Sequence, residues 1–219
     1  MRLHQQHFLE LALARQALRF GEFTLKSGRI SPYFFNAGRF DSGAALATLG
    51  RCYADTLACA NVEFDMLFGP AYKGIPLATA LALALAARGR DVPVAFDRKE
   101  AKDHGEGGVL IGAPVAGRVV IVDDVITAGT AAREAFARIA AAGGEVCAVL
   151  VALDRQERGQ DDERSAACEL SQRFGVPVLA IAGLSELLHF TADRPELAAH
   201  AQALMRYRER YGAIERDPR

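Results

Sequence analysis

The stretch Val119-Val120-Ile121-Val122-Asp123-Asp124-Val125-Ile126-Thr127-Ala128-Gly129-Thr130 carries the strongest structural signal in this sequence. Its first four residues are apolar and β-branched, which predicts a buried strand, and two acids follow that strand directly. A turn of small residues then opens a helix that is expected to run to about Ala142 and to stop at Gly143-Gly144. Ligands of an open α/β sheet bind beyond the carboxyl ends of its strands, so this turn is expected at a binding site.

The same alternation of apolar runs and helices continues along most of the chain. Strands are predicted at residues 64–68, 92–96, 119–122, 146–153 and 176–181, and helices at residues 75–88, 130–142 and 163–174. Near-continuous apolar runs joined by helices are typical of strands that are buried on both faces of a mostly parallel sheet. The sequence therefore predicts an α/β fold.

The two ends of the chain follow other patterns. Helices are predicted at residues 3–18, from Asp41 or Ser42 to about residue 60, and at 195–211, with two short strands at 23–26 and 33–36. The segment 97–116 is glycine-rich and charged, and only Val109-Leu110-Ile111 within it indicates a strand. We find no internal repeat and no low-complexity linker, so we expect a single domain spanning residues 1–219.

Composition argues against several classes of protein. The 219 residues carry a formal net charge of −1, so no general attraction to nucleic acid or to a membrane surface is expected. The four cysteines form no Cys-x-x-Cys pair, which fits a reducing compartment. The polar N-terminal residues do not resemble a secretory signal, and the most apolar stretch, 75–87, is too short to span a bilayer. We expect a cytoplasmic protein with no nucleic-acid and no membrane partner.

The turn after the acids has the chemistry of a phosphate site. Residues 127–130 offer backbone N–H groups, two hydroxyls and the N-terminus of a helix, which together favour an anion. Asp123 and Asp124 suit the vicinal hydroxyls of a ribose, either directly or through Mg²⁺. The alternative is that the two acids merely cap a turn. Neither a Gly-x-x-x-x-Gly-Lys-Ser/Thr loop nor a Gly-x-Gly-x-x-Gly motif is present to indicate another nucleotide site.

Five further motifs occur in order along the chain: FGEFTLKSG (20–28), SPYFFN (31–36), GPAYKG (69–74), RKEAKDHGEG (98–107) and DRQERG (154–159). The 119–130 stretch resembles the phosphoribosyl-diphosphate signature of type I phosphoribosyltransferases. The five motifs resemble more narrowly those of the bacterial orotate phosphoribosyltransferases. The resemblance implies the type I phosphoribosyltransferase fold, with a mostly parallel central sheet flanked by helices and a small N-terminal hood formed mainly by about residues 1–40.

The resemblance also implies a reaction. The phosphoribosyl group of 5-phosphoribosyl 1-diphosphate would pass to orotate, giving orotidine 5′-monophosphate and diphosphate in pyrimidine (UMP) biosynthesis. Mg²⁺ would be the cofactor, held mainly by the substrate diphosphate and ribose hydroxyls, with Asp123 and Asp124 as further candidate ligands. Breaking the bond at the anomeric carbon builds positive charge on the ribose and negative charge on the leaving diphosphate, so acids, cations and exclusion of water are needed.

Site residues are carried over from the matching motifs. Orotate contacts are expected from Lys26, Phe34, Phe35, Thr127 and Arg155. Contacts to phosphoribosyl diphosphate are expected from Lys26, Tyr72, Lys73, Arg98, Lys99, Lys102, His104, Asp123, Asp124, Val125, Ile126, Thr127, Ala128, Gly129, Thr130 and Ala131. Catalytic roles fall to Lys102, His104, Asp123 and Asp124, and the bond between Ala71 and Tyr72 is expected to be cis. Adjacent strand residues face opposite ways, so one of Phe34 and Phe35 is expected in the core.

The cations near residue 100 have two interpretations. A run of charges is by default a solvated loop. Beside a phosphate site, however, Asp103, Glu106 and the glycines Gly105, Gly107 and Gly108 indicate that Lys102 and His104 lie on a lid over the diphosphate. In the family this lid closes over the neighbouring subunit's site, which implies a homodimer.

Two other functions remain open at this point. A purine phosphoribosyltransferase would leave Lys26 and Arg155 without an anionic base to bind. A regulator that senses phosphoribosyl diphosphate usually adds a DNA-binding helix-turn-helix and a basic face, and the chain has neither the spare length nor the charge for them.

Overall fold

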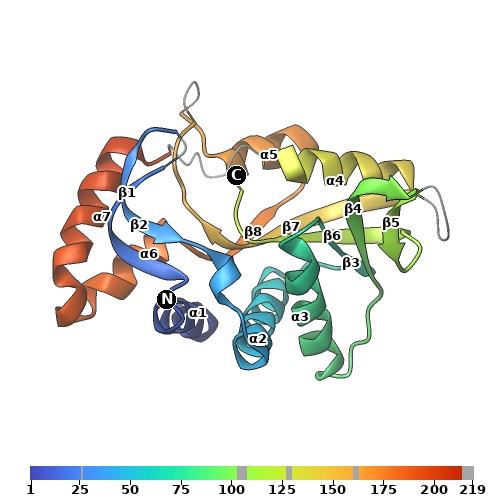
Figure 1. The fold of residues 1–219 in the computed structure, drawn as a ribbon, viewed down its shortest axis with the longest axis horizontal. Coiled ribbons are helices and arrows are strands. Elements are labelled where there is room, and N and C mark those ends of the chain that lie inside the picture. The colour runs from blue at the N-terminus through green and yellow to red at the C-terminus, as the bar shows by residue number, and fades with distance from the viewer. Residues whose placement is uncertain (26, 103–107, 127–129, 160–162, 214–219) are drawn as a thin grey trace.

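The computed structural model describes residues 1–25, 27–102, 108–126, 130–159 and 163–213, with the backbone alone at 99–102 and 108. A six-stranded sheet lies at its centre in the order β5-β4-β3-β6-β7-β8 (Figure 1). The strands are β3 (Met66–Gly69), β4 (Val94–Lys102), β5 (Gly108–Gly112), β6 (Gly117–Asp123), β7 (Gly144–Asp154) and β8 (Val178–Gly183). All neighbours pair in parallel except β5, which runs antiparallel to β4 at the edge. The predicted α/β class with a mostly parallel sheet is confirmed.

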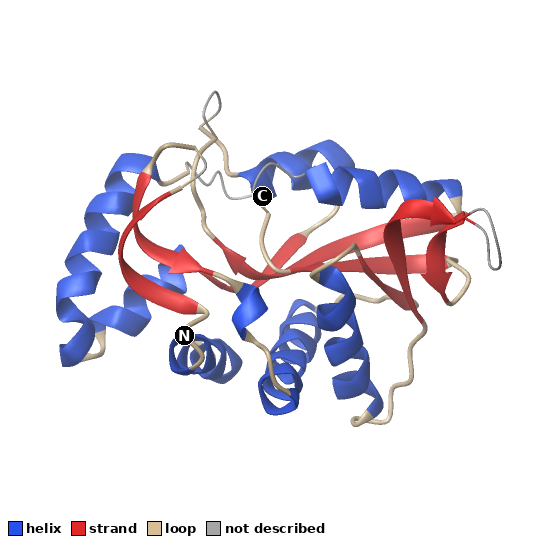
Figure 2. Ribbon diagram, viewed as in Figure 1, coloured by secondary structure: helices blue, strands red, loops and turns tan. Residues whose placement is uncertain are grey.

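Helices cover both faces of this sheet (Figure 2). One face carries α1 (Leu3–Ala14), α2 (Gly43–Ala60) and α3 (Gly74–Ala86), and the other carries α4 (Thr130–Ala141) and α5 (Ala166–Phe174). Strand β6 shows why both faces are apolar: Val120 and Val122 belong to the core on the α2 side, whereas Val119 and Ile121 belong to the core on the α4 side. A strand buried on both faces needs such a continuous run.

A smaller lobe holds the N-terminal hairpin. Strands β1 (Leu18–Thr24) and β2 (Ile30–Phe35) form a two-stranded antiparallel sheet, which the 3₁₀ turn η1 (Ala37–Arg39) connects to α2. The hairpin lies beside α6 (Leu184–Ala192), η2 (Pro195–Leu197) and α7 (Ala198–Tyr211) (Figure 1). Its rings contact α7 directly: Tyr33 meets Tyr207 edge to face, and Phe20 stacks on His200 at 4.6 Å between centroids. The described residues include no helix with the length and apolar character needed to cross a bilayer.

Some predicted boundaries were wrong, each for a local reason. Helix α1 ends at Ala14 and not at residue 18, because Gln16 adopts a positive φ of 55° and turns the chain into β1. Helix α5 begins at Ala166 and not at residue 163, because the Ser165 hydroxyl caps it by accepting a hydrogen bond from the Cys168 N–H. Helix α6 was not predicted, and the predicted 195–211 helix is divided into η2 and α7.

Strand β4 is also longer than its apolar run. It continues from the predicted end at Phe96 through the charged residues to Lys102, so Arg98, Lys99 and Lys102 lie on a strand where the sequence indicated a loop. Antiparallel pairing with β5 places Ala95 opposite Gly112, Asp97 opposite Leu110 and Lys102 opposite Gly108, with an irregular register between Asp97 and Lys102. Pairing at both ends of the charged segment thus overrides the low strand propensity of charged side chains.

Candidate active site

Three segments meet beyond the carboxyl ends of the central strands. The 69–74 loop follows β3, the paired acids end β6, and Arg155 follows β7. Two glycines allow the 69–74 loop to lie against β6: a Cβ on Gly74 would come within 2.7 Å of the Val122 carbonyl oxygen, and a Cβ on Gly69 within 2.4 Å of the Gly74 carbonyl oxygen. No side chain fits at those distances. The 69–74 loop therefore lies directly beside the acid pair at this edge of the sheet.

The paired acids are held by a network around Asp124. Its Oδ2 accepts a hydrogen bond from Lys73 Nζ at 2.6 Å, and its backbone N–H donates to Asp123 Oδ1 at 2.8 Å. Its carbonyl oxygen accepts from the N–H groups of Ala152 and Leu153 on β7. Asp124 is buried whereas Lys73 is exposed, so the carboxylate is fixed and the ammonium lies at the surface.

Asp123 differs electrically from its neighbour. Burial, and next the negative charge of Asp124, raise the pKa of Asp123 to about 7. On the α2 side of the sheet, the hydroxyl of the buried Tyr53 donates to the Asp123 carbonyl oxygen at 2.8 Å. Two carboxyl groups with such different environments suit a site where one accepts hydrogen bonds from hydroxyl groups and the other faces a cation.

The 69–74 loop presents its backbone beside this acid pair. The peptide bond between Ala71 and Tyr72 is cis, as the resemblance implied. The Ala71 N–H donates to Asp97 Oδ1 on β4 at 2.6 Å, and the Tyr72 side chain is exposed. The loop is thus anchored to β4 on one side and to Asp124 through Lys73 on the other.

The other candidate cations and the phosphate turn are described in part. Arg98 has a buried Nε with no hydrogen-bond partner among the described residues, which leaves it a donor for an anionic group. Val125 and Ile126 follow the acids, and Thr130 and Ala131 open α4. Residues Thr127, Ala128, Gly129, His104 and Lys26 lie outside the described residues, as do the side chains of Lys99 and Lys102.

On the hood side, Arg155 is enclosed. Its Nη2 donates to the Ser31 hydroxyl at 3.1 Å and lies 2.6 Å from Glu157 Oε1, and its guanidinium lies 4.3 Å above the Tyr33 ring. The hairpin therefore supplies two of the three contacts that orient this cation. Arg29 ties the hairpin to the same segment by donating to the carbonyl oxygens of Arg158 and Gly159.

The two phenylalanines of the hairpin face opposite ways, as strand geometry required. Phe35 packs against Phe8 and Phe40 in the core. Phe34 lies against Phe23, with the Arg19 guanidinium above its ring. Phe34 is therefore the residue of the two that lies away from the core.

Sequence reasoning missed three residues that shape the site: Asp97, Tyr53 and Glu157. Glu157 lies within the 154–159 motif, and its place two residues after Arg155 is a signal that could have been used. Asp97 stands at the start of a charged run that was interpreted as lid, and Tyr53 looked like one more apolar position of a helix. The hydrogen bonds of Asp97 and Tyr53 reach across the fold, so sequence spacing does not reveal them.

The side chains fit Mg²⁺ only in the presence of a substrate. No group of three or more His, Cys, Asp or Glu side chains suited to a metal occurs within the described ranges. Asp123 and Asp124 nevertheless supply two carboxyl groups, one of which already faces a lysine. Mg²⁺ is commonly held by one or two carboxylates together with substrate phosphates and water, so this pair fits that mode of binding.

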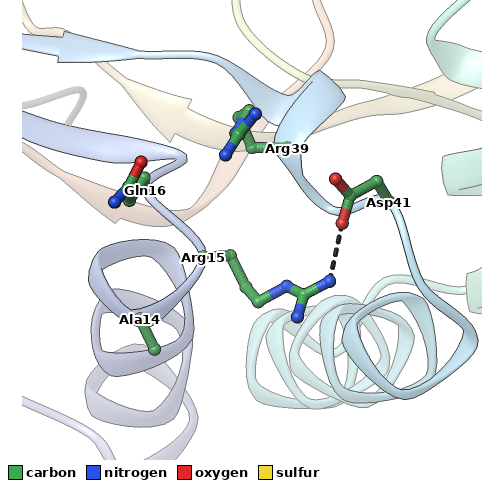
Figure 3. A pocket seen from close by; sticks show the side chains of 5 residues that line it. All are labelled: Ala14, Arg15, Gln16, Arg39 and Asp41. Carbon is green, nitrogen blue, oxygen red and sulfur yellow. Dashed lines mark hydrogen bonds and ion pairs between the residues drawn. The ribbon is translucent and has the colours of Figure 1, made fainter.

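A separate pocket lies between the end of α1, η1 and the start of α2 (Figure 3). It has a volume of about 280 Å³ and is lined by Ala14, Arg15, Gln16, Arg39 and Asp41. Arg15 reaches across it to Asp41, with 2.6 Å between Nη2 and Oδ1. None of the predicted site residues lines this pocket, so it is distinct from the edge described above.

Comparisons with known proteins place this arrangement in a family. Residues 41–178 match the Phosphoribosyl transferase domain family. An orotate phosphoribosyltransferase from Xanthomonas euvesicatoria pv. vesicatoria (strain 85-10) is 65% identical over 211 residues, which cover 95% of this chain and 96% of that protein. The chain belongs to the orotate phosphoribosyltransferase family.

Solved structures of orotate phosphoribosyltransferases have the same fold. The crystal structure from Francisella tularensis has a TM-score of 0.85 and 44% identity, covering 94% of this chain and 99% of that one. The enzyme from Mycobacterium tuberculosis H37Rv, in complex with 5-phospho-α-D-ribosyl 1-diphosphate, has a TM-score of 0.62 and 27% identity, covering 83% of this chain and 98% of that one. The resemblance found in the six sequence motifs is therefore confirmed at the level of the family.

Proposed function

We propose that this chain, acting as a single domain, transfers the phosphoribosyl group of 5-phosphoribosyl 1-diphosphate to N1 of orotate, giving orotidine 5′-monophosphate and diphosphate for pyrimidine biosynthesis. One observation carries the proposal. A buried acid pair at the end of β6 holds an exposed lysine, and a buried arginine follows the neighbouring strand β7. The first group suits a ribose and its diphosphate, and the second suits a planar anionic base.

The acid pair acts on the ribose. As the bond to the diphosphate breaks, positive charge grows at the anomeric carbon, and carboxylates at the ribose hydroxyls stabilise it. Asp123 and Asp124 accept hydrogen bonds from those hydroxyls, with Asp124 held in place by its bonds to β7. The turn at residues 127–129 and the N-terminus of α4 bind the 5′-phosphate.

The cations act on the diphosphate. Lys73 exchanges Asp124 for the diphosphate when the substrate arrives, because its ammonium group is already at the surface. Further positive charge comes from β4 and the lid, through Arg98, Lys99, Lys102 and His104. Among these, Lys102 makes the largest contribution to catalysis. Mg²⁺ would neutralise further charge on the diphosphate. It would be held mainly by the diphosphate and ribose hydroxyls of the substrate, with Asp123 and Asp124 as further candidate ligands.

Orotate binds on the hood side. Arg155 pairs with the orotate carboxylate, Lys26 and Thr127 add donors, and Phe34 provides the apolar wall. The expected contact from Phe35 is not part of the proposal, because Phe35 packs against Phe8 and Phe40 in the core. Ser31, Tyr33 and Glu157 hold the guanidinium in one place, so Arg155 cannot move to contact a base that lacks the carboxylate. Uracil and adenine are therefore poor substrates.

We propose a homodimer whose lid covers the partner's site. The outer face of α3 supports a partner surface: Tyr72, Pro76, Thr79 and Leu83 are exposed and recur at helical spacing beside the 69–74 loop. Exposed large apolar side chains on one face are typical of an interface. A cytoplasmic location is also proposed, with support from the four free cysteines.

The reaction is tested by the loss of orotate ultraviolet absorbance after addition of phosphoribosyl diphosphate and Mg²⁺. We expect turnover with orotate and little or none with uracil or adenine under the same conditions. Equal rates with uracil, or no loss of orotate absorbance at micromolar enzyme, contradict the proposal.

The shared lid is tested by complementation. Lys102→Ala and Arg155→Ala homodimers are each expected to be badly impaired. In a heterodimer of the two, a lid acting in trans leaves one site with both defects and the other intact, so activity returns. Co-expression with two affinity tags and tandem purification isolate this species for the absorbance assay. A heterodimer no more active than its parents excludes a lid that acts in trans.

A further inference from the structure

Asp97 is a buried carboxylate to which the proposed mechanism gives no role. It lies on β4 and is 2% exposed. Its Oδ1 accepts the hydrogen bond of the Ala71 N–H, and its Oδ2 pairs with the guanidinium of Arg138 on α4. A buried charge is costly unless it is paired and hydrogen-bonded, and here both oxygens have partners.

These contacts join three segments that reach the proposed diphosphate site. Phe96 lies opposite Gly69 in the β3–β4 ladder, so Asp97 stands level with the start of the 69–74 loop. Arg138 lies in the last turn of α4, the helix whose first residue, Thr130, directly follows residues 127–129. The strand that carries Asp97 continues with Arg98, Lys99 and Lys102. A single carboxylate therefore bonds the diphosphate loop to the helix behind the phosphate turn.

We propose that Asp97 and Arg138 are positioning residues for phosphoribosyl diphosphate binding, which hold the 69–74 loop at a fixed distance from the phosphate helix α4. This inference rests on the function proposed above. The substrate has a phosphate at each end, so its two binding segments must be kept apart by a constant separation. A hydrogen bond to a charged carboxylate holds the loop more firmly than a neutral one, and Arg138 compensates the charge.

A second aspartate of similar chemistry separates this role from general support. Asp65 Oδ2 accepts the Arg118 backbone N–H at 2.8 Å, and Asp65 Oδ1 pairs with the Arg118 guanidinium at 3.1 Å. This pair lies at the other end of the sheet, where β6 begins, and its side chains are 49% and 43% exposed. It is a matched control, because it joins an aspartate, a backbone N–H and an arginine away from the site.

The first test is kinetic, with substitutions that remove charge but keep shape. Arg138→Met leaves Asp97 as a lone buried charge, and Asp97→Asn keeps an oxygen for the Ala71 N–H but leaves Arg138 with Glu134 alone, at 3.5 Å. We expect each to raise KM for phosphoribosyl diphosphate about 10- to 100-fold. KM for orotate should stay within about twofold of wild type, because Arg155 is untouched. Asp65→Asn should change neither KM.

The double variant Asp97→Asn/Arg138→Met tests whether the two residues act as one link. It has no lone charge, and an amide oxygen remains for the Ala71 N–H. We expect its KM for phosphoribosyl diphosphate to be no higher than that of the worse single variant, because the contact between the 69–74 loop and α4 is lost in every variant, whereas independent sites would multiply their effects. A double variant as impaired as the sum of the single ones, or equal increases in KM for both substrates, overturns the proposal.

The second test does not depend on catalysis. Hydrogen exchange of the Ala71 amide is measured in the free protein, and phosphoribosyl diphosphate binding by calorimetry with Mg²⁺. In Asp97→Ala this amide should exchange faster while the β6 and β7 amides stay protected. Unchanged Ala71 exchange overturns the proposal even if the enzyme is active. A wild-type protein that binds phosphoribosyl diphosphate without consuming orotate refutes the proposed reaction but leaves the positioning role measurable.

Discussion

Two ion pairs flank the site, and they differ in the burial of their side chains rather than in the distance between nitrogen and oxygen. Lys73–Asp124 and Arg155–Glu157 each have a nitrogen–oxygen distance of 2.6 Å. The Lys73 side chain is 53% exposed, whereas Arg155 and Glu157 are 15% and 12% exposed. Arg155 is also held by the Ser31 hydroxyl and the Tyr33 ring. The two pairs therefore have the same nitrogen–oxygen distance, but the Lys73 side chain is freer to move than the Arg155 side chain.

The difference assigns the two cations to different tasks. An exposed lysine has a compact charge on a flexible stem, so it can leave Asp124 for an incoming diphosphate. A buried, stacked guanidinium stays in place and selects a partner that matches its plane. Both polar contacts of Arg155 use Nη2, so within the described part of the chain the group keeps donors for a planar anion. We therefore propose that Lys73 serves affinity for the diphosphate, and that Arg155 serves both selectivity for orotate and stability.

The largest expected effect follows from removal of the buried cation. Arg155→Met should lower kcat/KM for orotate by about 10³-fold, because a site built around a charged contact loses it. It should also lower the free energy of unfolding by about 3–5 kcal/mol, because Glu157 is left as a buried charge. Steady-state kinetics and urea denaturation measure the two effects. Binding of phosphoribosyl diphosphate should stay near wild type.

A paired substitution separates the two tasks of Arg155. In Arg155→Met/Glu157→Gln no lone charge remains, so most of the lost stability should return while orotate use should not. If the double variant regains orotate turnover, Arg155 acts only through folding, and its assignment to the orotate carboxylate fails.

A smaller effect, with the opposite pattern, is expected for the exposed cation. Lys73→Met should raise KM for phosphoribosyl diphosphate about 10²-fold and leave KM for orotate nearly unchanged. Its effect on the melting temperature should be smaller than that of Arg155→Met, because half of the Lys73 side chain is already in water. Arg88→Met removes an exposed Arg–Asp pair of 2.8 Å and serves as the control. A parallel rise in KM for orotate contradicts the division of tasks.

The acid pair beneath Lys73 should give the unfolding free energy an unusual pH dependence. The folded-state pKa of Asp123 is raised to about 7, above its value in the unfolded chain. Between pH 4 and pH 7 the folded state therefore holds the extra proton, so this group makes stability fall as pH rises. Asp123→Asn removes the dependence and should be more stable than wild type at pH 8, by on the order of 1–4 kcal/mol, but not at pH 4.

This prediction is measured by urea denaturation at several pH values with EDTA present, so that no metal binds the carboxylates. Glu157→Gln is the comparison from the other pair, since its carboxylate has a buried cation beside it. If wild type and Asp123→Asn differ by the same amount at pH 4 and pH 8, the raised pKa is wrong.

Most of the fold could be predicted because its strands are continuous apolar runs. The six central strands, β5 through Val109-Leu110-Ile111 alone, and the helices α2, α3 and α4 were indicated by apolar runs and periodicity. The exceptions needed tertiary pairing. The charged part of β4 is a strand only because β5 lies beside it, and α6 was missed because it follows β8 with no intervening turn signal.

The candidate site was predictable where one motif carries the chemistry. Asp123 and Asp124 end a predicted strand, so their place at the binding edge of the sheet was expected, whereas Lys73 was named only as a candidate diphosphate contact. Glu157 and Asp97 were not predicted as partners, because their contribution to the site depends on burial. A charge in a charged segment looks solvated in sequence, and only the fold shows that Asp97 is buried.

The smallest expected effect compares one buried tyrosine from each region. Tyr53 and Tyr33 are both fully buried, but the Tyr53 hydroxyl donates to the Asp123 carbonyl oxygen, whereas the Tyr33 hydroxyl has no hydrogen-bond partner among the residues described. Tyr53→Phe should therefore cost about 1 kcal/mol of unfolding free energy. Tyr33→Phe should change it by less than about 0.5 kcal/mol, or stabilise the protein, because a buried unpaired hydroxyl is removed and the ring beneath Arg155 stays. Urea denaturation of both variants at one pH decides between them, with orotate kinetics as a check that Arg155 has not moved. A larger loss of unfolding free energy from Tyr33→Phe than from Tyr53→Phe would show that the Tyr33 hydroxyl has a hydrogen-bond partner in solution. The surroundings of the Arg155–Glu157 pair would then be more polar than the contacts of Arg155 indicate.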